Sequence, residues 1–212
     1  MIVEIKGVLS FLKVRLLFIF TAIKTEYMQS QSKKYIAFLR GINVGGHHKV
    51  PMADLRQELK NLAFENIITI LNTGNIIFDS KSEDSENLEY TISEHLEGHF
   101  GFPVPTIVRK AKTILDLFNS DPFKDFELTK DIRFYISFLK NDKESEFEIP
   151  WTSPNESFNI IAKKDKNILS VLDLSVSKTP KAMEVLEKAF GKQNITTRNW
   201  NTVKRIEKKL RS

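Results

Sequence analysis

Cysteine is absent from this sequence of 212 residues. A chain without thiols has no disulfide framework, no cysteine nucleophile and no thiolate ligand for zinc or an iron–sulfur cluster. This composition fits a reducing compartment, and we therefore expect a cytoplasmic protein. The sequence also lacks any cofactor-binding motif, so we expect no cofactor.

A long apolar run is also missing. The longest uninterrupted one is Leu16–Ile23, because Lys13 and Arg15 break the stretch before it. A bilayer span needs about 20 apolar residues, and no A-x-A-like cleavage site follows the run. We therefore predict no membrane association for the folded protein. Residues 1–33 are interpreted as an extra or disordered segment, with the true start at Met28; an amphipathic anchor is the alternative.

The net charge of +5 is unevenly distributed along the chain. Residues 1–27 carry four cationic and two acidic side chains, and residues 198–212 carry six cationic and one acidic side chain, so 28–197 have a net charge of −2. This distribution excludes a globally basic nucleic-acid binder but leaves room for a local basic patch.

The first half of the chain alternates between strand and helix patterns. Apolar residues at helical spacing predict helices over 51–63 and about 88–100, and β-rich runs predict strands at 35–39, 67–71, 76–79 and 103–109. The order β, α, β, β, α, β is that of a ferredoxin-like unit, with both helices on one face of an antiparallel sheet. We therefore predict an α+β fold.

The second half predicts another small α+β unit whose topology the sequence leaves open. A short helix at 111–119 and a connection at 120–130 precede strands at 132–139, 157–163 and 168–174, with a polar loop at 140–154. Helices at 180–190 and about 199–210 close the chain. We divide the chain into domains at 34–119 and 120–212, and the residues show no internal repeat.

A glycine-rich loop follows the first strand. Gly41, Gly45 and Gly46 lie between a strand and a helix, and Arg40 and Lys49 flank them. Such a loop can direct backbone N–H groups at a phosphate or carboxylate. The pattern matches neither the P-loop nor the dinucleotide-binding motif. The alternative is structural, with the glycines serving a turn, Asn43 capping locally and Arg40 pairing with an acid.

Two further polar segments have both structural and functional interpretations. Asn72-Thr73-Gly74-Asn75 has the residues of a tight hairpin turn, with amide groups that a ligand could use. In the last segment, Asn199 is a candidate helix cap, and Trp200 has the spacing of a core residue. The final helix has a cationic side. These cations either interact favourably with the helix dipole or neutralise phosphate groups of a nucleic acid. The cations are Lys204, Arg205, Lys208 and Lys209.

The imidazoles offer little chemistry. His95 and His99 are four residues apart on a helix, but no third ligand is evident, so we interpret them as a surface pair and predict no metal site. His47 and His48 lie in the glycine-rich loop and are the nearest candidates for an acid or base. Neither G-x-S-x-G nor H-E-x-x-H occurs, and we assign no catalytic residue.

Three segments together resemble a bacterial family of unknown function, domain-of-unknown-function family 1697. They are FLRGINVGG at 38–46, LNTGNIIF at 71–78 and TTRNWNTV at 196–203. The resemblance implies an α+β protein of about this size. It implies no activity, cofactor or catalytic residue. In the family, serine is usual where this chain has Thr73, and the hydroxyl group is retained.

We expect the polar segments to converge on a cleft between the two units, where ligands often bind. The predicted function is binding of an anionic ligand there, which is a nucleotide, a phosphorylated metabolite or RNA. The alternatives are a small-molecule enzyme using a loop histidine with an Arg40 clamp, and a protein-interaction module. The predicted ligand-binding residues are Arg40, Asn43, Gly45, Gly46, His47, Lys49, Asn72, Asn75, Arg198, Asn199 and Lys204.

Overall fold

The first unit is a four-stranded antiparallel sheet covered by two helices. The computed structural model describes residues 15 and 32–212, so the predicted start at Met28 lies outside the described residues. The elements in chain order are β1 (Lys33–Leu39), α2 (Met52–Asn61), β2 (Glu65–Ile70), β3 (Asn75–Ser80), α3 (Ser85–Phe100) and β4 (Thr106–Lys110). The sheet order is β2-β3-β1-β4, and the elements follow one another along the chain as β, α, β, β, α, β.

Both helices of this unit pack on the same face of the sheet. Tyr35 and Ala37 of β1 point to that face and join one core with Leu55 and Leu59 of α2 and with the apolar stripe of α3. Helix α3 begins at a cap where the Asp84 carboxylate accepts backbone N–H groups, and it ends at Gly101 in the left-handed conformation.

The second unit contains a five-stranded antiparallel sheet in the order β6-β7-β8-β5-β9. A helix, α4 (Ala111–Asn119), leads into it. The remaining elements are β5 (Ile132–Leu139), β6 (Trp151–Thr152), β7 (Phe158–Lys164), β8 (Asn167–Asp173), α5 (Thr179–Phe190), the 3₁₀ turn η1 (Lys192–Asn194), β9 (Ile195–Asn199) and α6 (Trp200–Arg211). Strands β6 and β9 were not predicted from the sequence, and β6 lies within the predicted loop.

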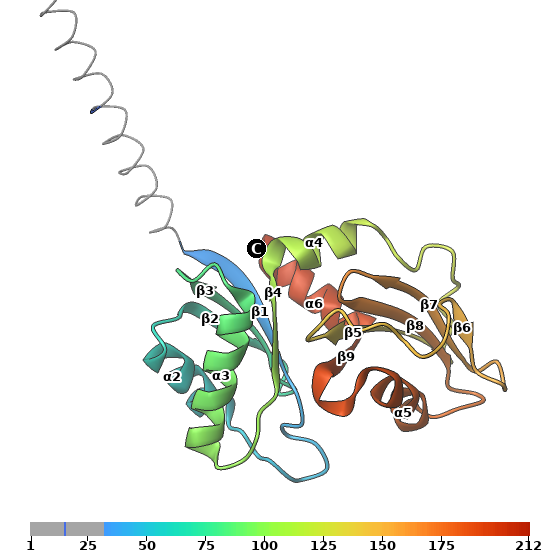
Figure 1. Ribbon diagram of the computed structural model, residues 1–212, viewed down its shortest axis with the longest axis horizontal. Coiled ribbons are helices and arrows are strands. Elements are labelled where there is room, and N and C mark those ends of the chain that lie inside the picture. The colour runs from blue at the N-terminus through green and yellow to red at the C-terminus, as the bar shows by residue number, and fades with distance from the viewer. Residues whose placement is uncertain (1–14, 16–31) are drawn as a thin grey trace, which may run out of the picture.

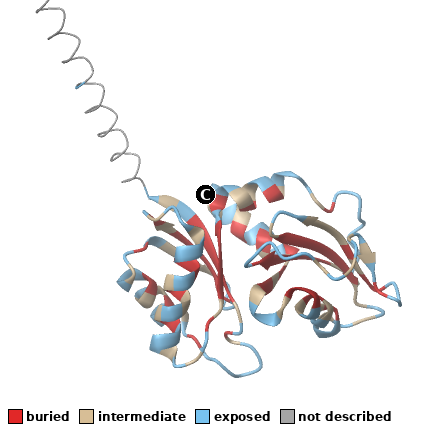
Figure 2. Ribbon diagram, viewed as in Figure 1, coloured by how far each residue is buried: buried red, intermediate tan, exposed pale blue. Residues whose placement is uncertain are grey.

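The two sheets enclose a common core. Figure 1 shows α2 and α3 outside the first sheet, α5 beside the second, and α4 and α6 between the two units. The red strands of Figure 2 mark the buried layers on both sides of this central region. One apolar cluster joins Phe38 of β1, Phe138 of β5, Ile114 of α4 and Val203 of α6. The Phe38 and Phe138 rings stack with their centroids 4.1 Å apart.

The structure contains an internal repeat that was not recognised in the sequence. Strands β2, β3, β1 and β4 of the first sheet have the same order as β7, β8, β5 and β9 of the second. In each unit one helix precedes the last of these strands, and another, α4 or α6, follows it directly. Helix α2 has no counterpart; the segment with β6 takes its place in the chain.

Short sequence matches accompany this structural repeat. YIAFLR at 35–40 matches YISFLK at 135–140, LEGHFG at 96–101 matches LEKAFG at 186–191, and VRKAKTI at 108–114 matches TRNWNTV at 197–203. The spacing between matched segments differs from pair to pair because α2 and the loops differ in length, so no fixed period is visible in the sequence.

The α+β class is confirmed. The predicted division at residues 119 and 120 stays a prediction, although α4, assigned to the first unit, packs against α6 of the second. Within residues 32–212, no helix combines the length and the apolar character that a membrane crossing requires.

Candidate functional site

Two cavities flank the glycine-rich loop. The first, which we call the Arg40 cavity, has a volume of about 370 Å³ and lies between the end of β1, helix α5 and strand β9. Its polar lining consists of Arg40, Thr73, Glu187, Thr196, Thr197, Arg198, Asn199 and Thr202. The second, the His47 cavity, has about 450 Å³ and is lined by Asn43, Gly46, His47, Lys49 and Asn72, together with Val50, Pro51 and Met52 at the start of α2.

Arg40 connects the two units across the first cavity. Its guanidinium pairs with the Glu187 carboxylate of α5 at 2.5 Å and also donates to the Lys192 backbone carbonyl. The Arg40 side chain is one-fifth exposed, so it borders the cavity without being sealed in it. In the structural interpretation of the glycine-rich loop, Arg40 pairs with an acid. That ion pair is present, and it forms part of the cavity wall.

Arg198 is almost completely buried beside the same cavity. It lies on β9, and its Nε donates to the Asn75 side-chain oxygen. One terminal nitrogen donates to Thr196 Oγ1 at 2.8 Å and to the Thr197 carbonyl, and the other donates to the Leu39 carbonyl at 2.6 Å. Burial lowers the pKa of Arg198 to about 10, so the guanidinium keeps its charge at neutral pH.

The internal repeat provides a direct comparison for Arg198, because Arg109 occupies the matching position on β4. Each guanidinium donates to the backbone carbonyl at the end of the other unit's first strand, Leu39 or Leu139. Each also lies over one ring of the central aromatic pair, with Arg198 Cζ 5.5 Å from the Phe38 centroid and Arg109 Cζ 6.0 Å from that of Phe138. The two arginines thus bracket the stacked phenylalanines.

The two arginines differ in their counter-ions. Arg109 Nη1 lies 3.5 Å from the buried carboxylate of Glu89, whose pKa is raised by desolvation. When α3 and α5 are aligned on their LE-x-x-FG ends, Thr179 replaces Glu89. Within residues 32–212, no carboxylate lies within ion-pair distance of Arg198, whose acceptors are all neutral oxygens. No opposite charge therefore compensates the Arg198 guanidinium, and Arg198 lines the Arg40 cavity.

Asn43 ties the glycine-rich loop to its neighbours. Its amide nitrogen donates to the Val50 and Asn72 carbonyls, and its side-chain oxygen accepts the Val50 N–H. These bonds hold the loop against the start of α2 and the β2–β3 turn. Asn43 and Asn72 therefore have a structural role next to the His47 cavity, in which His47 and Lys49 are exposed.

The other imidazoles are accounted for by contacts within the fold. The His48 ring stacks on Phe102 at 4.3 Å and lies outside both cavities. The rings of His95 and His99 face the same carboxylate, with nitrogens 2.8 and 3.5 Å from the Glu58 oxygens. Within the part of the chain that the structure describes, no group of three or more His, Asp or Glu side chains is arranged to hold a metal ion.

The structure thus divides the predicted ligand-binding residues. Arg40, Arg198 and Asn199 line the Arg40 cavity, and Asn75 lies behind Arg198 as its hydrogen-bond acceptor. Asn43, Gly46, His47, Lys49 and Asn72 line the His47 cavity. Gly45 and Lys204 line neither. Residues from all three polar segments therefore line the Arg40 cavity, and five of the predicted residues lie instead at the His47 cavity on the other side of the loop.

Five polar residues at this site were not predicted from the sequence: Thr73, Glu187, Thr196, Thr197 and Thr202. Thr197 and Thr202 fall within a segment that was already singled out, but strand β9 was not predicted there. Glu187 lies on a helix whose pattern indicates only an apolar core face. Its approach to Arg40 depends on how the units pack, so no local signal in the sequence marks it.

Gly74 is needed where the β2–β3 turn meets β1. Its φ is +76°, and a Cβ atom at this position would lie 2.7 Å from Leu39 Cβ. We expect Gly74→Ala to lower the free energy of unfolding by about 2 kcal/mol or more, through backbone strain together with this clash. Urea denaturation checks this.

Gly46→Ala is the matched control, because Gly46 also has a positive φ of +80° but nothing within 4 Å of its added Cβ. It should lower stability by only about 1 kcal/mol. Equal losses for the two variants would show that the close approach to Leu39 has no energetic weight.

Comparison with known proteins places the chain in a family. It is 26% identical to the solved structure of conserved bacterial protein SP0830 from Streptococcus pneumoniae, with a TM-score of 0.57, and the alignment covers 84% of this chain and 98% of that one. No curated protein matches the sequence. A family model described as protein of unknown function, DUF1697, matches residues 32–167. That match spans more than half of the chain, and the protein belongs to the DUF1697 family.

Proposed function

We propose that the protein binds a small anionic ligand, carrying a phosphate or carboxylate group, in the Arg40 cavity. The observation that carries the proposal is the uncompensated charge of buried Arg198. Its counterpart Arg109 has Glu89 as counter-ion, whereas the Arg198 side of the repeat has a cavity. A buried charge without an opposite charge is unfavourable, so an anion in this cavity supplies the missing partner.

The cavity also contains the groups needed to hold such a ligand. The N–H groups of Arg198 already have acceptors, so it contributes mainly its charge, and Arg40 is the cation that can rearrange toward a ligand. Arg40 and Arg198 against Glu187 give the lining a net charge of +1. Hydroxyl groups of Thr73, Thr197 and Thr202 add neutral hydrogen-bonding groups. A volume of about 370 Å³ suits a small metabolite or a single nucleotide.

The enzyme alternative receives less support from the geometry. It requires a loop histidine beside the Arg40 clamp, but His47 lines the other cavity and His48 stacks on Phe102. A cytoplasmic location remains part of the proposal, supported by the cysteine-free composition. Cell fractionation tests it.

The test is thermal stabilisation at low salt by inorganic phosphate, AMP, ATP, sugar phosphates and citrate. A ligand present at about 100 times its dissociation constant adds roughly 2.7 kcal/mol to the free energy of unfolding, which gives a readable shift. Arg40→Gln should weaken binding of the stabilising anion about tenfold or more, because it removes a charged hydrogen-bond donor.

Lys112→Gln is the matched control. It removes the same charge from an exposed i,i+4 pair with Asp116, away from the cavity, and should leave binding unchanged. The proposal is contradicted if none of the anions stabilises the wild-type protein, or if Arg40→Gln and Lys112→Gln weaken binding equally.

A further inference from the structure

Helix α6 has a strongly cationic exposed side. Lys204, Arg205, Lys208 and Lys209, which we call the α6 basic face, are all exposed, whereas Trp200, Val203 and Ile206 on the opposite side are buried. The only acid of α6, Glu207, pairs with Arg211 instead. Within residues 32–212, no carboxylate lies within 4.0 Å of the four cations.

The internal repeat shows that the fold does not require this charge. Helix α4 has the same place in the first unit as α6 has in the second, and both pack into the central core. The sequence of α4 contains one lysine and one aspartate, and these two residues pair with each other at 2.7 Å. A helix of balanced charge therefore fills the equivalent position, so the α6 basic face needs another explanation.

We propose that the α6 basic face binds the phosphate backbone of nucleic acid, at a site separate from the Arg40 cavity. Lys204 and Lys208 form one i,i+4 pair and Arg205 and Lys209 another, and the members of each pair are about 5–6 Å apart, so the four cations can contact neighbouring phosphates. Contacts to phosphates fix the position of a protein on the duplex but carry no sequence information. Binding is therefore expected to be independent of sequence.

Other polyanionic partners fit this surface less well. A membrane-binding helix inserts apolar side chains between the headgroups, but the exposed large apolar residues lie outside α6. An acidic protein partner would need an apolar centre for its interface, and α6 exposes none. The α6 basic face exposes only cations, and this fits a phosphate backbone, which is recognised through its charge.

Fluorescence anisotropy with a labelled duplex of about 20 base pairs tests the proposal. Four phosphate contacts give a slope of about −3.6 for log K against log salt concentration, which weakens binding about 150-fold between about 50 and 200 mM salt. The double variant Lys204→Gln/Lys208→Gln should reduce the slope to about −1.8. Circular dichroism would confirm that this variant is folded, as expected for exposed substitutions.

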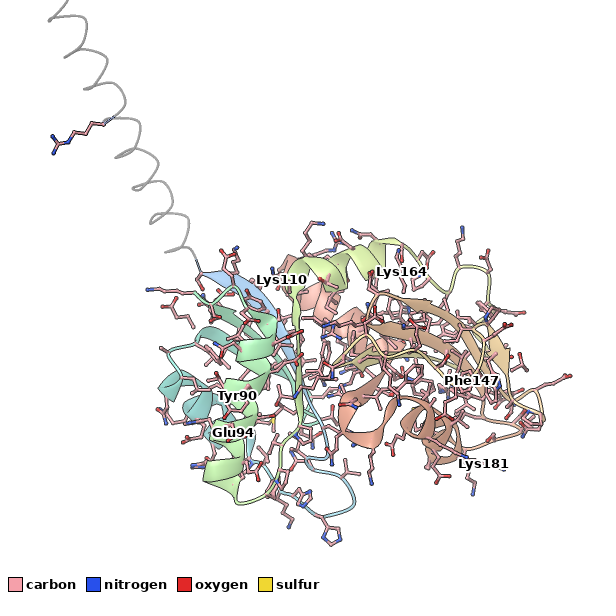
Figure 3. The ribbon with its side chains drawn as sticks, in the orientation of Figure 1. Tyr90, Glu94, Lys110, Phe147, Lys164 and Lys181 are labelled. Carbon is pink, nitrogen blue, oxygen red and sulfur yellow. The ribbon has the colours of Figure 1, made fainter. Side chains whose placement is uncertain are left out.

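The matched control is Lys60→Gln/Lys181→Gln, which removes the same charge from exposed residues of α2 and α5. Figure 3 shows Lys181 on α5, on the opposite side of the second unit from α4 and α6. This control should keep the wild-type slope. No binding to the duplex at about 50 mM salt, or equal slopes for the two double variants, would overturn the proposal.

The nucleic-acid and cavity proposals fail independently. Arg40→Gln should leave the duplex slope unchanged, because Arg40 lies in the cavity and is already paired with Glu187. Conversely, Lys204→Gln/Lys208→Gln should leave thermal stabilisation by a small anion unchanged. Loss of duplex binding in Arg40→Gln would overturn the assignment of two separate sites.

Discussion

Replacing Arg198 by methionine should lower the free energy of unfolding by about 3 kcal/mol or more. Methionine has a similar length, but it leaves the Asn75 side-chain oxygen, the Thr196 hydroxyl and the Leu39 carbonyl without their donor. Each unpaired buried acceptor costs about 1–3 kcal/mol, and removal of the lone buried charge offsets part of the sum. Equilibrium urea denaturation measures the difference.

The Arg198→Lys variant should lose a similar amount of stability. An ammonium group cannot reproduce the planar guanidinium, whose nitrogens donate to β1, β3 and β9 at the same time. The control is Arg133→Met, since Arg133 donates only to the nearby Lys130 and Ile132 carbonyls. A loss of at most about 0.5–1 kcal/mol is expected there. A wild-type stability for Arg198→Met would mean that the observed hydrogen bonds do not hold the units together.

The elements of the first unit follow from local patterns. The helical spacing of Leu55 and Leu59 and the apolar stripe of α3 depend on nearby residues only, so the sequence is sufficient to predict them. The predicted limits of α4 and β5 coincide with those observed. In these segments the periodicity, the breakers and the burial all agree.

Strand β9 shows where this reasoning fails. Its sequence, ITTRN, has the β-branched residues of a strand, but it is short and polar and runs directly into α6. Burial of Thr196 and Arg198 depends on pairing with β5 and on the end of β1, which are remote in sequence. Without β9, the second sheet lacks the strand that makes its order match that of the first.

The candidate site was predictable only in part, for the same reason. Arg40 and Arg198 were identified from polar segments at the ends of predicted elements, and the structure places both at one cavity. The feature that distinguishes Arg198, its missing counter-ion, emerges only from comparison with Arg109 and Glu89. That comparison requires the repeat, which insertions conceal in the sequence.

The second large effect is expected at the stacked Phe38–Phe138 pair in the centre of the molecule. Phe138→Ala should lower the free energy of unfolding by about 3–5 kcal/mol, because it leaves a cavity in the core that both sheets share. The Phe138 ring is fully buried against Phe38 of the other unit. We expect urea denaturation of the wild-type protein and of the variant to show one cooperative transition, since loss of this contact affects both units.

A double-mutant cycle separates the contact between the units from the burial of each ring. Phe38→Leu and Phe138→Leu retain most of the apolar volume, so each variant stays folded, while the stacked contact is lost in both. The double variant should lose less stability than the sum of the single losses, with a coupling energy of about 0.5–1.5 kcal/mol. Additive losses, or two resolved unfolding transitions, would instead show that the units fold independently and that the Phe38–Phe138 stack does not couple them. Coupling through this stack would also help to hold the Arg40 cavity together. Arg198 lies over the Phe38 ring, and residues of both units line the cavity.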